Sequence, residues 1–375
     1  MKLARRQTLQ LLAASIAFGG AGLPAFAQGD DDLDDDDGLR SGKVFTSSNA
    51  AAGNELLVYG RAADGSLQLV ARAATQGFGG GAALGSQGAV ALAGDARHVF
   101  VVNAASNTVS TFAVRRKSLR LASVIDSGGL HPISVTEHDG IVYVLNDQGT
   151  GNVAGFRNHG GQLQPIAGSL RGLSAQGGTA PAQVGFSADG RAIVVSEKGT
   201  SLLTSYRVQA DGGLDAAIET ASAGATPFGF AVNRRNQLLV SEAATSALSS
   251  YRFADAEPAR PVLVSASVLS GQAAACWVAV TPNGDLAYTV NAGSSSVSSY
   301  RVAGSGAVTL AHAVAGSTSN AGGTDAAVSA DGRRLYVLAT RGGAIVSFDV
   351  AADGSLVAAG NASGVPVSSV GLAAN

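Results

Sequence analysis

The segment Leu248-Ser-Ser-Tyr251-Arg-Phe253 is one of several similar strands that decide the fold of this chain. It recurs nearly unchanged as Leu203-Thr-Ser-Tyr206-Arg-Val208 and as Val297-Ser-Ser-Tyr300-Arg-Val302. Each such segment carries one aromatic residue near its end. These residues follow one another at intervals of 53, 44, 50, 45, 49 and 48 positions, and they are Tyr59, Phe112, Phe156, Tyr206, Tyr251, Tyr300 and Phe348. Self-similarity at this period predicts one four-stranded sheet per copy, arranged radially. The sequence therefore predicts an all-β fold, a seven-bladed β-propeller.

Tight turns between these strands support the same interpretation, because Asp-Gly and Asn-Gly pairs suit two-residue hairpins. Seven aromatic strands are accompanied by only six inner turns. The segment Lys43-Val-Phe-Thr-Ser-Ser48 resembles a second strand without a first, and Val367-Ser-Ser-Val-Gly-Leu372 resembles a first strand without a second. We therefore expect blade one to be closed by strands from both termini, which removes the free edge of a sheet. The six turns lie at residues 94–97, 138–140, 189–191, 233–236, 283–285 and 331–333.

Two segments precede the repeats, which we expect to span residues 43–375. Residues 1–27 join a basic start to an apolar stretch and a small-residue cleavage pattern, which predicts a secretory signal peptide and a periplasmic or secreted protein. The pair Arg5-Arg6 favours a signal of the twin-arginine type, and an ordinary export signal remains the alternative. Residues 28–42 contain a run of seven Asp, whose like charges predict an acidic, disordered tether.

Charge and cysteine content exclude several classes of function. Outside the signal and the acidic run, 22 Lys and Arg face 20 Asp and Glu, so no basic surface predicts nucleic-acid binding. No apolar stretch predicts a membrane span in the repeats. The single cysteine, Cys276, excludes an internal disulfide. We expect a monomer that binds a small molecule, with a lactone or an organic acid as the ligand class.

One face of the predicted disc holds the candidate site, because second strands end there and innermost strands begin there. We call this face the mouth. The second strands are predicted to end at Asn49, Asn103, Asn146, Glu197, Glu242, Asn291 and Ala339. The innermost strands are predicted to begin near Gln87, His131, Gln183, Phe228, Trp277, Asp325 and Pro366.

Two glutamates are the candidate catalytic residues. Glu197 and Glu242 occupy the slot that Asn fills in most other blades, and a long charged side chain caps a turn poorly. We expect both carboxylates to face a common channel, where proximity and desolvation drive the pKa values of such a pair apart for acid–base work. Lys198 would offset charge that develops on a substrate oxygen. The alternative is a solvated rim that holds a Glu–Lys pair.

The candidate binding residues lie mainly at the starts of the innermost strands. His131 is the only histidine among these starts, and Gln183 and Asp325 are polar where apolar residues are expected. Trp277 and Phe228 are large apolar residues, for which core packing is the alternative. For Asn291, the alternative is a hydrogen bond to its own turn. The predicted ligand-binding set is therefore His131, Gln183, Phe228, Trp277, Asn291 and Asp325.

A metal ion is the main alternative to chemistry by side chains alone. Oxygens from the strand ends are suitable ligands for calcium, which needs six to eight of them. No histidine cluster has the spacing of a zinc or copper site. Seven blades make a wide channel, in which these oxygens are too far apart to share one ion. We therefore predict no metal and no cofactor; the oxygens in question belong to Asn103, Asn146, Glu197, Glu242 and Asn291.

Several strand-and-turn phrases resemble a known family over residues 43–375. The segments Phe186-Ser-Ala-Asp-Gly-Arg191, Val142-Tyr-Val-Leu-Asn146 and Ala287-Tyr-Thr-Val-Asn291 are similar to the seven-bladed lactonase propellers. That family joins 6-phosphogluconolactonase-type enzymes and 3-carboxy-cis,cis-muconate lactonising enzymes, and the phrases also resemble YVTN-type repeats. The resemblance implies chemistry without a cofactor, carried by histidine, arginine and glutamate around the channel.

The resemblance departs from the phosphogluconolactonase pattern at one motif. Those enzymes carry a His-x-His pair at an innermost strand, and here the matching stretch is Pro181-Ala-Gln183, while the acidic position persists as Glu197. The loss of both histidines argues against a sugar-phosphate lactone as substrate. The sequence predicts an exported, lactonase-like propeller that hydrolyses or forms a small cyclic ester. The competing class is a non-catalytic propeller that binds a ligand or another protein.

Overall fold

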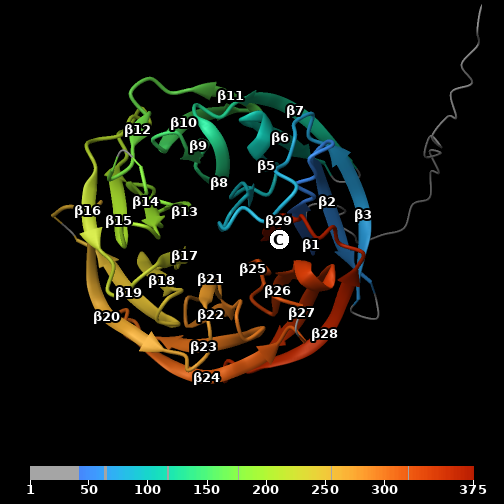
Figure 1. The fold of residues 1–375 in the computed structure, drawn as a ribbon, viewed down its shortest axis with the longest axis vertical. Coiled ribbons are helices and arrows are strands. Elements are labelled where there is room, and N and C mark those ends of the chain that lie inside the picture. The colour runs from blue at the N-terminus through green and yellow to red at the C-terminus, as the bar shows by residue number, and fades with distance from the viewer. Residues whose placement is uncertain (1–41, 63–65, 116–117, 176, 255, 320) are drawn as a thin grey trace, which may run out of the picture. The chain divides into compact units, whose positions relative to one another are not determined.

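The computed structural model describes residues 42–375 except 63–65, 116–117, 176, 255 and 320. The predicted signal peptide and nearly all of the acidic tether lie outside the described residues. The described residues form seven antiparallel sheets arranged in a ring, with the innermost strands around a common axis (Figure 1). The prediction of an all-β, seven-bladed propeller is confirmed. No helix among the described residues has the length and apolarity needed to cross a membrane.

Both termini contribute to blade one, as the sequence predicts. The strand order of this sheet is β29-β1-β2-β3, and β29 pairs antiparallel with β1 so that Thr46 lies opposite Leu372. The Thr46 hydroxyl donates a 2.7 Å hydrogen bond to the Gly371 carbonyl, which fixes this register. The innermost strand begins at Val370, four residues later than the predicted start at Pro366. The strands are β29 (Val370–Ala374), β1 (Lys43–Ser47), β2 (Glu55–Arg61) and β3 (Leu67–Ala74).

The next three blades follow in chain order, each from its innermost to its outermost strand. Blade two holds β4 (Val90–Leu92), β5 (His98–Asn103), the short 3-10 helix η2 (Ala104–Ser106), β6 (Thr108–Val114) and β7 (Leu119–Asp126). Blade three holds β8 (Leu130–His138), β9 (Ile141–Gln148), β10 (Asn152–His159), β11 (Gln162–Pro165) and β12 (Arg171–Gly172). Blade four holds β13 (Pro181–Phe186), β14 (Ala192–Glu197), β15 (Leu202–Arg207) and β16 (Ile218–Ala221).

The last three blades repeat the same order. Blade five holds β17 (Pro227–Val232), β18 (Gln237–Glu242), β19 (Ala247–Phe253) and β20 (Pro261–Leu269). Blade six holds β21 (Ala275–Val280), β22 (Leu286–Asn291), β23 (Ser296–Val302) and β24 (Val308–Ser317). Blade seven holds β25 (Asp325–Val328), β26 (Arg334–Ala339), the 3-10 helix η3 (Thr340–Gly342), β27 (Ala344–Val350) and β28 (Leu356–Ser363).

The core lies between neighbouring blades, since each sheet buries both faces. The second and third strands are almost entirely buried, whereas the outermost strands consist mainly of partly buried and exposed residues. Each repeated aromatic residue lies on the third strand and has at most 2% of its surface exposed. The Tyr143 hydroxyl of blade three shows how adjacent blades are joined, because it donates a 2.7 Å hydrogen bond to the Gly212 carbonyl of blade four.

Candidate functional site

The axis of the propeller is filled by a segment that enters from the connection between blades one and two. We call residues 85–89 the axial segment, and the chain between β3 and β5 reaches the middle of the ring in Figure 1. The side chain of Gln87 crosses to blade six, where its amide donates to the Val278 carbonyl at 2.8 Å and accepts from the Val278 N–H at 3.0 Å. The Gln87 N–H also donates to the Ala182 carbonyl of blade four at 3.0 Å. The channel is therefore closed at its centre.

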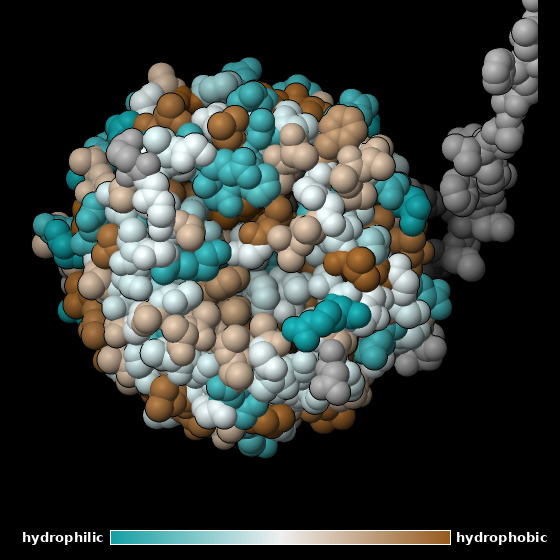
Figure 2. All heavy atoms as spheres, in the orientation of Figure 1, coloured by the Kyte–Doolittle hydropathy of each residue, from teal (hydrophilic) through white to brown (hydrophobic). Residues whose placement is uncertain are grey.

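Further hydrogen bonds join the axial segment to blades three and six. The Ser86 hydroxyl donates to the Ile133 carbonyl at 2.9 Å, and Trp277 Nε1 donates to the Ser86 carbonyl at 2.9 Å. The Val135 N–H donates to the Gly88 carbonyl at 2.8 Å. In the orientation of Figure 1, the space-filling view shows a hollow that ends on packed atoms, with no opening through the disc (Figure 2). The mouth therefore has a floor, which the sequence did not predict.

The glycine-rich stretch that leads to the axial segment is required by close packing. A Cβ atom at Gly79 would lie 2.1 Å from the Asn49 carbonyl carbon, and one at Gly77 would lie 2.4 Å from the Asn103 side chain. Backbone atoms can approach this closely only where no side chain intervenes. The asparagines at the ends of two second strands thus hold the connecting loop against the mouth.

Three of the predicted site residues meet above this floor. The rings of Phe228 and Trp277 make an edge-to-face contact with centroids 5.2 Å apart. The ammonium of Lys198 lies 4.8 Å from the Phe228 centroid and donates to the Gly85 carbonyl at 2.6 Å. Burial lowers the pKa of Lys198, and the negative charge of Asp147 partly opposes that shift. The ammonium is therefore held beside the axial segment by an aromatic face and a carbonyl oxygen, and the Asp147 carboxylate acts on it through its charge.

A histidine–carboxylate pair lies at the same mouth. His131 Nδ1 is 2.6 Å from Asp147 Oδ1, and both side chains are about one-quarter exposed. The backbone of His131 has φ +58°, a left-handed conformation that is uncommon for residues other than glycine. The Asn107 side chain accepts the His131 N–H at 2.7 Å and so supports that conformation. With Nδ1 paired to Asp147, the tautomer assigned from this network leaves Nε2 available.

Asp147 is a site residue that the sequence interpretation missed. The interpretation placed the functional positions at the last residue of each second strand, such as Asn146 and Glu197. Side chains alternate along a strand, so the residue after each of these points the other way. In blades three and four those residues are Asp147 and Lys198, which lie at the mouth. A polar residue at a strand end followed directly by a charged residue was the sequence pattern that could have identified Asp147.

Glu197 and Glu242 do not meet in a channel, so that prediction is wrong. Neither has any exposed surface. Glu197 accepts hydrogen bonds from the Ser174 hydroxyl, from the Ser174 N–H at 3.1 Å and from the Thr200 hydroxyl at 2.8 Å. Glu242 accepts from three hydroxyls within blade five: Thr245, Ser249 and Ser267. Each carboxylate is thus enclosed by donors, as a buried charge requires.

Two of the other polar strand ends are also buried and hydrogen-bonded within their own blade. Asn291, a predicted ligand-binding residue, is fully buried and donates to the Ser296 and Ser298 hydroxyls at 3.1 and 2.9 Å. Asn103 makes the same pair of bonds to Thr108 and Ser110. These side chains bridge to the third strand of their own blade rather than to a common axis. Across the residues that the structure describes, no group of three or more His, Cys, Asp or Glu side chains is arranged to hold a metal ion.

Gln183 and Asp325 lie on innermost strands but make different contacts. Gln183 joins blades four and five, since its amide donates to the Phe230 carbonyl at 3.0 Å and accepts from the Phe230 N–H at 2.7 Å. Asp325 lies beside the axial segment, where it accepts from Gly88 N–H at 3.3 Å and from Ala326 N–H at 2.7 Å. Desolvation raises the pKa of Asp325 to about 7 despite these backbone hydrogen bonds.

The buried Asp325 gives a prediction for stability against pH. Its carboxyl ionises near pH 3.8 in the unfolded chain and near pH 7 in the folded one, so the free energy of unfolding should fall as pH rises between these values. The maximum slope from this group is about 1.4 kcal/mol per pH unit. Asp325→Asn removes this ionisation. We expect the free energy of unfolding of Asp325→Asn, relative to that of the parent protein, to increase from pH 4.5 to pH 7.5 when both are unfolded in urea.

A pH-independent difference would contradict this prediction. Asp349→Asn is the matched control, since this carboxylate is about half exposed and paired with Arg334.

Comparisons with known proteins agree with this architecture. Residues 162–259 match the family model described as lactonase, seven-bladed beta-propeller. A comparison with curated proteins found no match. The periplasmic gluconolactonase of Pseudomonas aeruginosa is 17% identical, with a TM-score of 0.69 over 88% of this chain and 98% of that one.

Two further solved structures show the same fold. A proposed 6-phosphogluconolactonase of Bacteroides fragilis is 17% identical, with a TM-score of 0.68 over 88% of this chain and 97% of that one. A protein of unknown function from Desulfotomaculum acetoxidans is 13% identical, with a TM-score of 0.68 over 88% and 98%. At these identities the structures establish the fold alone. The chain is thus a seven-bladed β-propeller, and the resemblance to the lactonase propellers is confirmed over residues 162–259, which match the family model.

Proposed function

We propose that this chain hydrolyses a small lactone at the mouth, using His131, Asp147 and Lys198. The observation that carries the proposal is the 2.6 Å contact between His131 and Asp147, whose negative charge also acts on the ammonium of Lys198. A histidine oriented by a carboxylate is a general base, and a fixed cation stabilises an oxyanion. The match to the lactonase family model supports an ester ring as the reacting group.

The reaction follows from the positions of the donors. His131 Nε2 takes a proton from water as the water oxygen bonds to the ester carbonyl carbon. Asp147 holds the imidazolium that forms, and Lys198 stabilises the negative charge on the former carbonyl oxygen. The bond from that carbon to the ring oxygen then breaks, and the imidazolium returns its proton to the leaving oxygen. The product is an open-chain hydroxy acid, and no cofactor is required.

The mouth also limits the substrate. Lys198 favours a lactone that carries an anionic group, and the apolar faces of Phe228 and Trp277 favour a compact ring beside it. The axial segment closes the channel, so the substrate enters and leaves by the same face. In this proposal Glu197 and Glu242 support their blades. We further propose that residues 1–27 direct export and that the protein acts as a monomer in the periplasm.

A lactone panel tests the proposal. The purified mature protein is expected to hydrolyse one or more γ- or δ-lactones of organic acids. The rate is measured from the protons that the hydroxy-acid product releases. His131→Gln removes the base and is expected to lower kcat by a factor of about 10²–10⁴. Lys198→Met keeps the length of the side chain and is expected to raise KM and lower kcat.

The control variant is His159→Gln, because His159 is exposed at the end of an outer hairpin. It should leave the rate unchanged, and thermal melting should show that all three variants are folded. Hydrolysis that persists in folded His131→Gln would reject this site. Lactone binding without turnover would instead support the non-catalytic class of propeller.

A further inference from the structure

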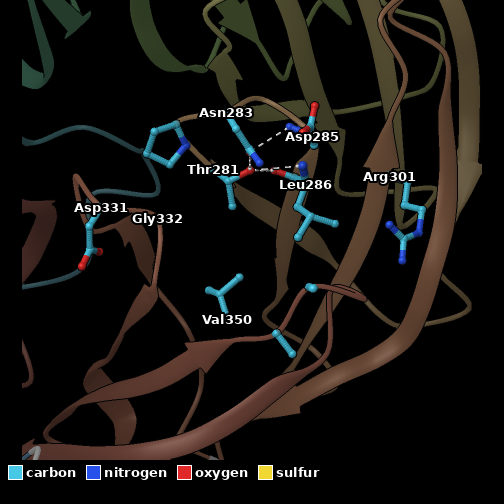
Figure 3. A pocket seen from close by; sticks show the side chains of 11 residues that line it. Thr281, Asn283, Asp285, Leu286, Arg301, Asp331, Gly332 and Val350 are labelled. Carbon is cyan, nitrogen blue, oxygen red and sulfur yellow. Dashed lines mark hydrogen bonds between the residues drawn. The ribbon is translucent and has the colours of Figure 1, made fainter.

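A second cavity lies between blades six and seven, on the face opposite the mouth. Its volume is about 460 Å³. Turn residues line it, because the turns between innermost and second strands lie at this face. Figure 3 shows Asp331 and Arg301 at opposite sides of the cavity, with Leu286 and Val350 between them. We call this cavity the six–seven crevice.

The equivalent crevice between blades five and six is filled by two side chains of blade five. The guanidinium of Arg235 donates to the carbonyl oxygens of Asn283, Gly284 and Val302, with distances of 3.1 and 3.3 Å for the first and last. The amide of Gln237 donates to two more carbonyl oxygens, those of Ala303 and Gly304, at 3.4 and 2.8 Å. Five backbone carbonyls of blade six thus form one acceptor surface.

Blade seven presents the same acceptor surface to the six–seven crevice. The turns of the two blades correspond in their hydrogen bonds. The Gly284 N–H donates to the Thr281 carbonyl, and the Gly332 N–H donates to the Ser329 carbonyl in the same way. Likewise, Gly306 donates to Ala303 as Gly354 does to Ala351. The five residues of blade seven that match the acceptors of blade six all line the cavity, and they are Asp331, Gly332, Val350, Ala351 and Ala352.

Among the described residues of blade six, no side chain donates a hydrogen bond to these five carbonyls, although Arg301 reaches the nearby Asp353 carbonyl. Leu286 stands at the position of Gln237, since both residues close the hydrogen bond of the same turn. The intervening positions hold Asn283 and Gly284 instead of an arginine. The six–seven crevice therefore keeps the residues that correspond to the carbonyl acceptors of Arg235 and Gln237, and has the apolar Leu286 in place of Gln237.

The charged group at the crevice that suits a cation is the Asp331 carboxylate. Asp331 and Asp285 line the crevice together with Arg301, which donates to the Asp353 carbonyl at 3.1 Å. Asp285 is already paired with Arg235 of blade five at 2.8 Å. Desolvation raises the pKa of Asp331, but hydrogen bonds from Ser329 and from the Arg333 N–H, together with the positive charges of Arg333 and Arg61, outweigh it, and the pKa lies below its usual value. The carboxylate is therefore ionised at neutral pH.

We propose that the six–seven crevice binds an alkylguanidinium group, with its planar N–H fork on the blade-seven carbonyls and the Asp331 carboxylate, and its alkyl chain against Leu286. The fork geometry distinguishes guanidinium from ammonium, which is a compact point charge. The group belongs either to a free small molecule or to an arginine side chain of a polypeptide. This site is independent of the lactone site at the mouth.

Thermal melting of the mature protein with n-butylguanidinium at millimolar concentrations tests the proposal. We expect a saturable rise of about 1–2 °C in Tm at ten times Kd. n-Butylammonium should give no saturable rise. Asp331→Asn is expected to weaken binding about tenfold, because a charge-assisted hydrogen bond is lost. Leu286→Gln restores the blade-five pattern, so it should raise Tm without ligand and abolish the response.

The matched control is Asp189→Asn, because Asp189 accepts the same two hydrogen bonds in the blade-four turn as Asp331 does in blade seven. It should leave the response to butylguanidinium intact. A Gly-Arg-Gly peptide with blocked ends separates the sources: tighter binding than butylguanidinium indicates a polypeptide arginine, and weaker binding indicates a free molecule. The absence of a saturable rise, an equal rise with butylammonium, or a full response in both crevice variants would overturn the proposal.

Discussion

A chain that ends at Pro366 is expected to lose most of its stability. The truncation removes β29, whose Val370 and Leu372 are buried against neighbouring strands. It also removes a close contact with blade two, since a Cβ at Gly371 would lie 2.4 Å from the Val90 N atom. Blade one would keep an exposed β1 edge, which pairs readily with other chains. We expect aggregation, or a loss comparable with the total stability of a domain, about 5–15 kcal/mol.

Calorimetry and light scattering at increasing protein concentration measure this result. Deletion of residues 30–37 is the control, because it shortens the chain without removing any described strand, and it should leave melting nearly unchanged. A truncated protein that stayed monomeric and melted like the full-length chain would contradict the role of β29.

Glu242→Ala is expected to cause the largest loss of stability among single substitutions at the strand ends. Three hydroxyls lose their acceptor, and a cavity forms in a position without solvent access. Each buried group left without a partner costs about 1–3 kcal/mol. We expect a decrease of more than about 3 kcal/mol in the free energy of unfolding, measured in urea.

Two further variants test whether the loss of stability comes from the buried carboxylate itself. Glu242→Gln keeps the shape and one acceptor oxygen, so it should lose less stability than Glu242→Ala. Glu219→Ala changes an exposed residue of blade four and should have almost no effect. If Glu242→Ala melted like the parent protein but lost lactone hydrolysis, the carboxylate would be catalytic rather than structural.

The sequence predicted the blades because their signals are local. An aromatic third strand such as that of Tyr251 and a turn such as that at Asp331 carry their pattern within a few residues, and the repeat period then gives the number of blades. The closure by β1 and β29 followed from counting strands. The direction of the Glu197 side chain did not follow, because a shift of one residue reverses the face on which a side chain lies.

The floor of the mouth could not be predicted for a different reason. The contact between Gln87 and Val278 joins residues that are 191 positions apart, and nothing in the local pattern of either residue records the other. The same holds for Lys198 and Gly85, which meet only because the ring closes. Such contacts depend on the diameter of the whole propeller.

The axial segment has a consequence for how this repeat protein changes in evolution. Repeat proteins usually gain or lose copies freely, since each copy contacts only its neighbours. Here one stretch of chain spans the ring, from Ala182 in blade four to Val278 in blade six. An eighth blade would widen the ring beyond the reach of the Gln87 side chain, and a six-bladed ring would crowd it. The axial segment therefore fits a ring of seven blades and disfavours a change in the number of blades.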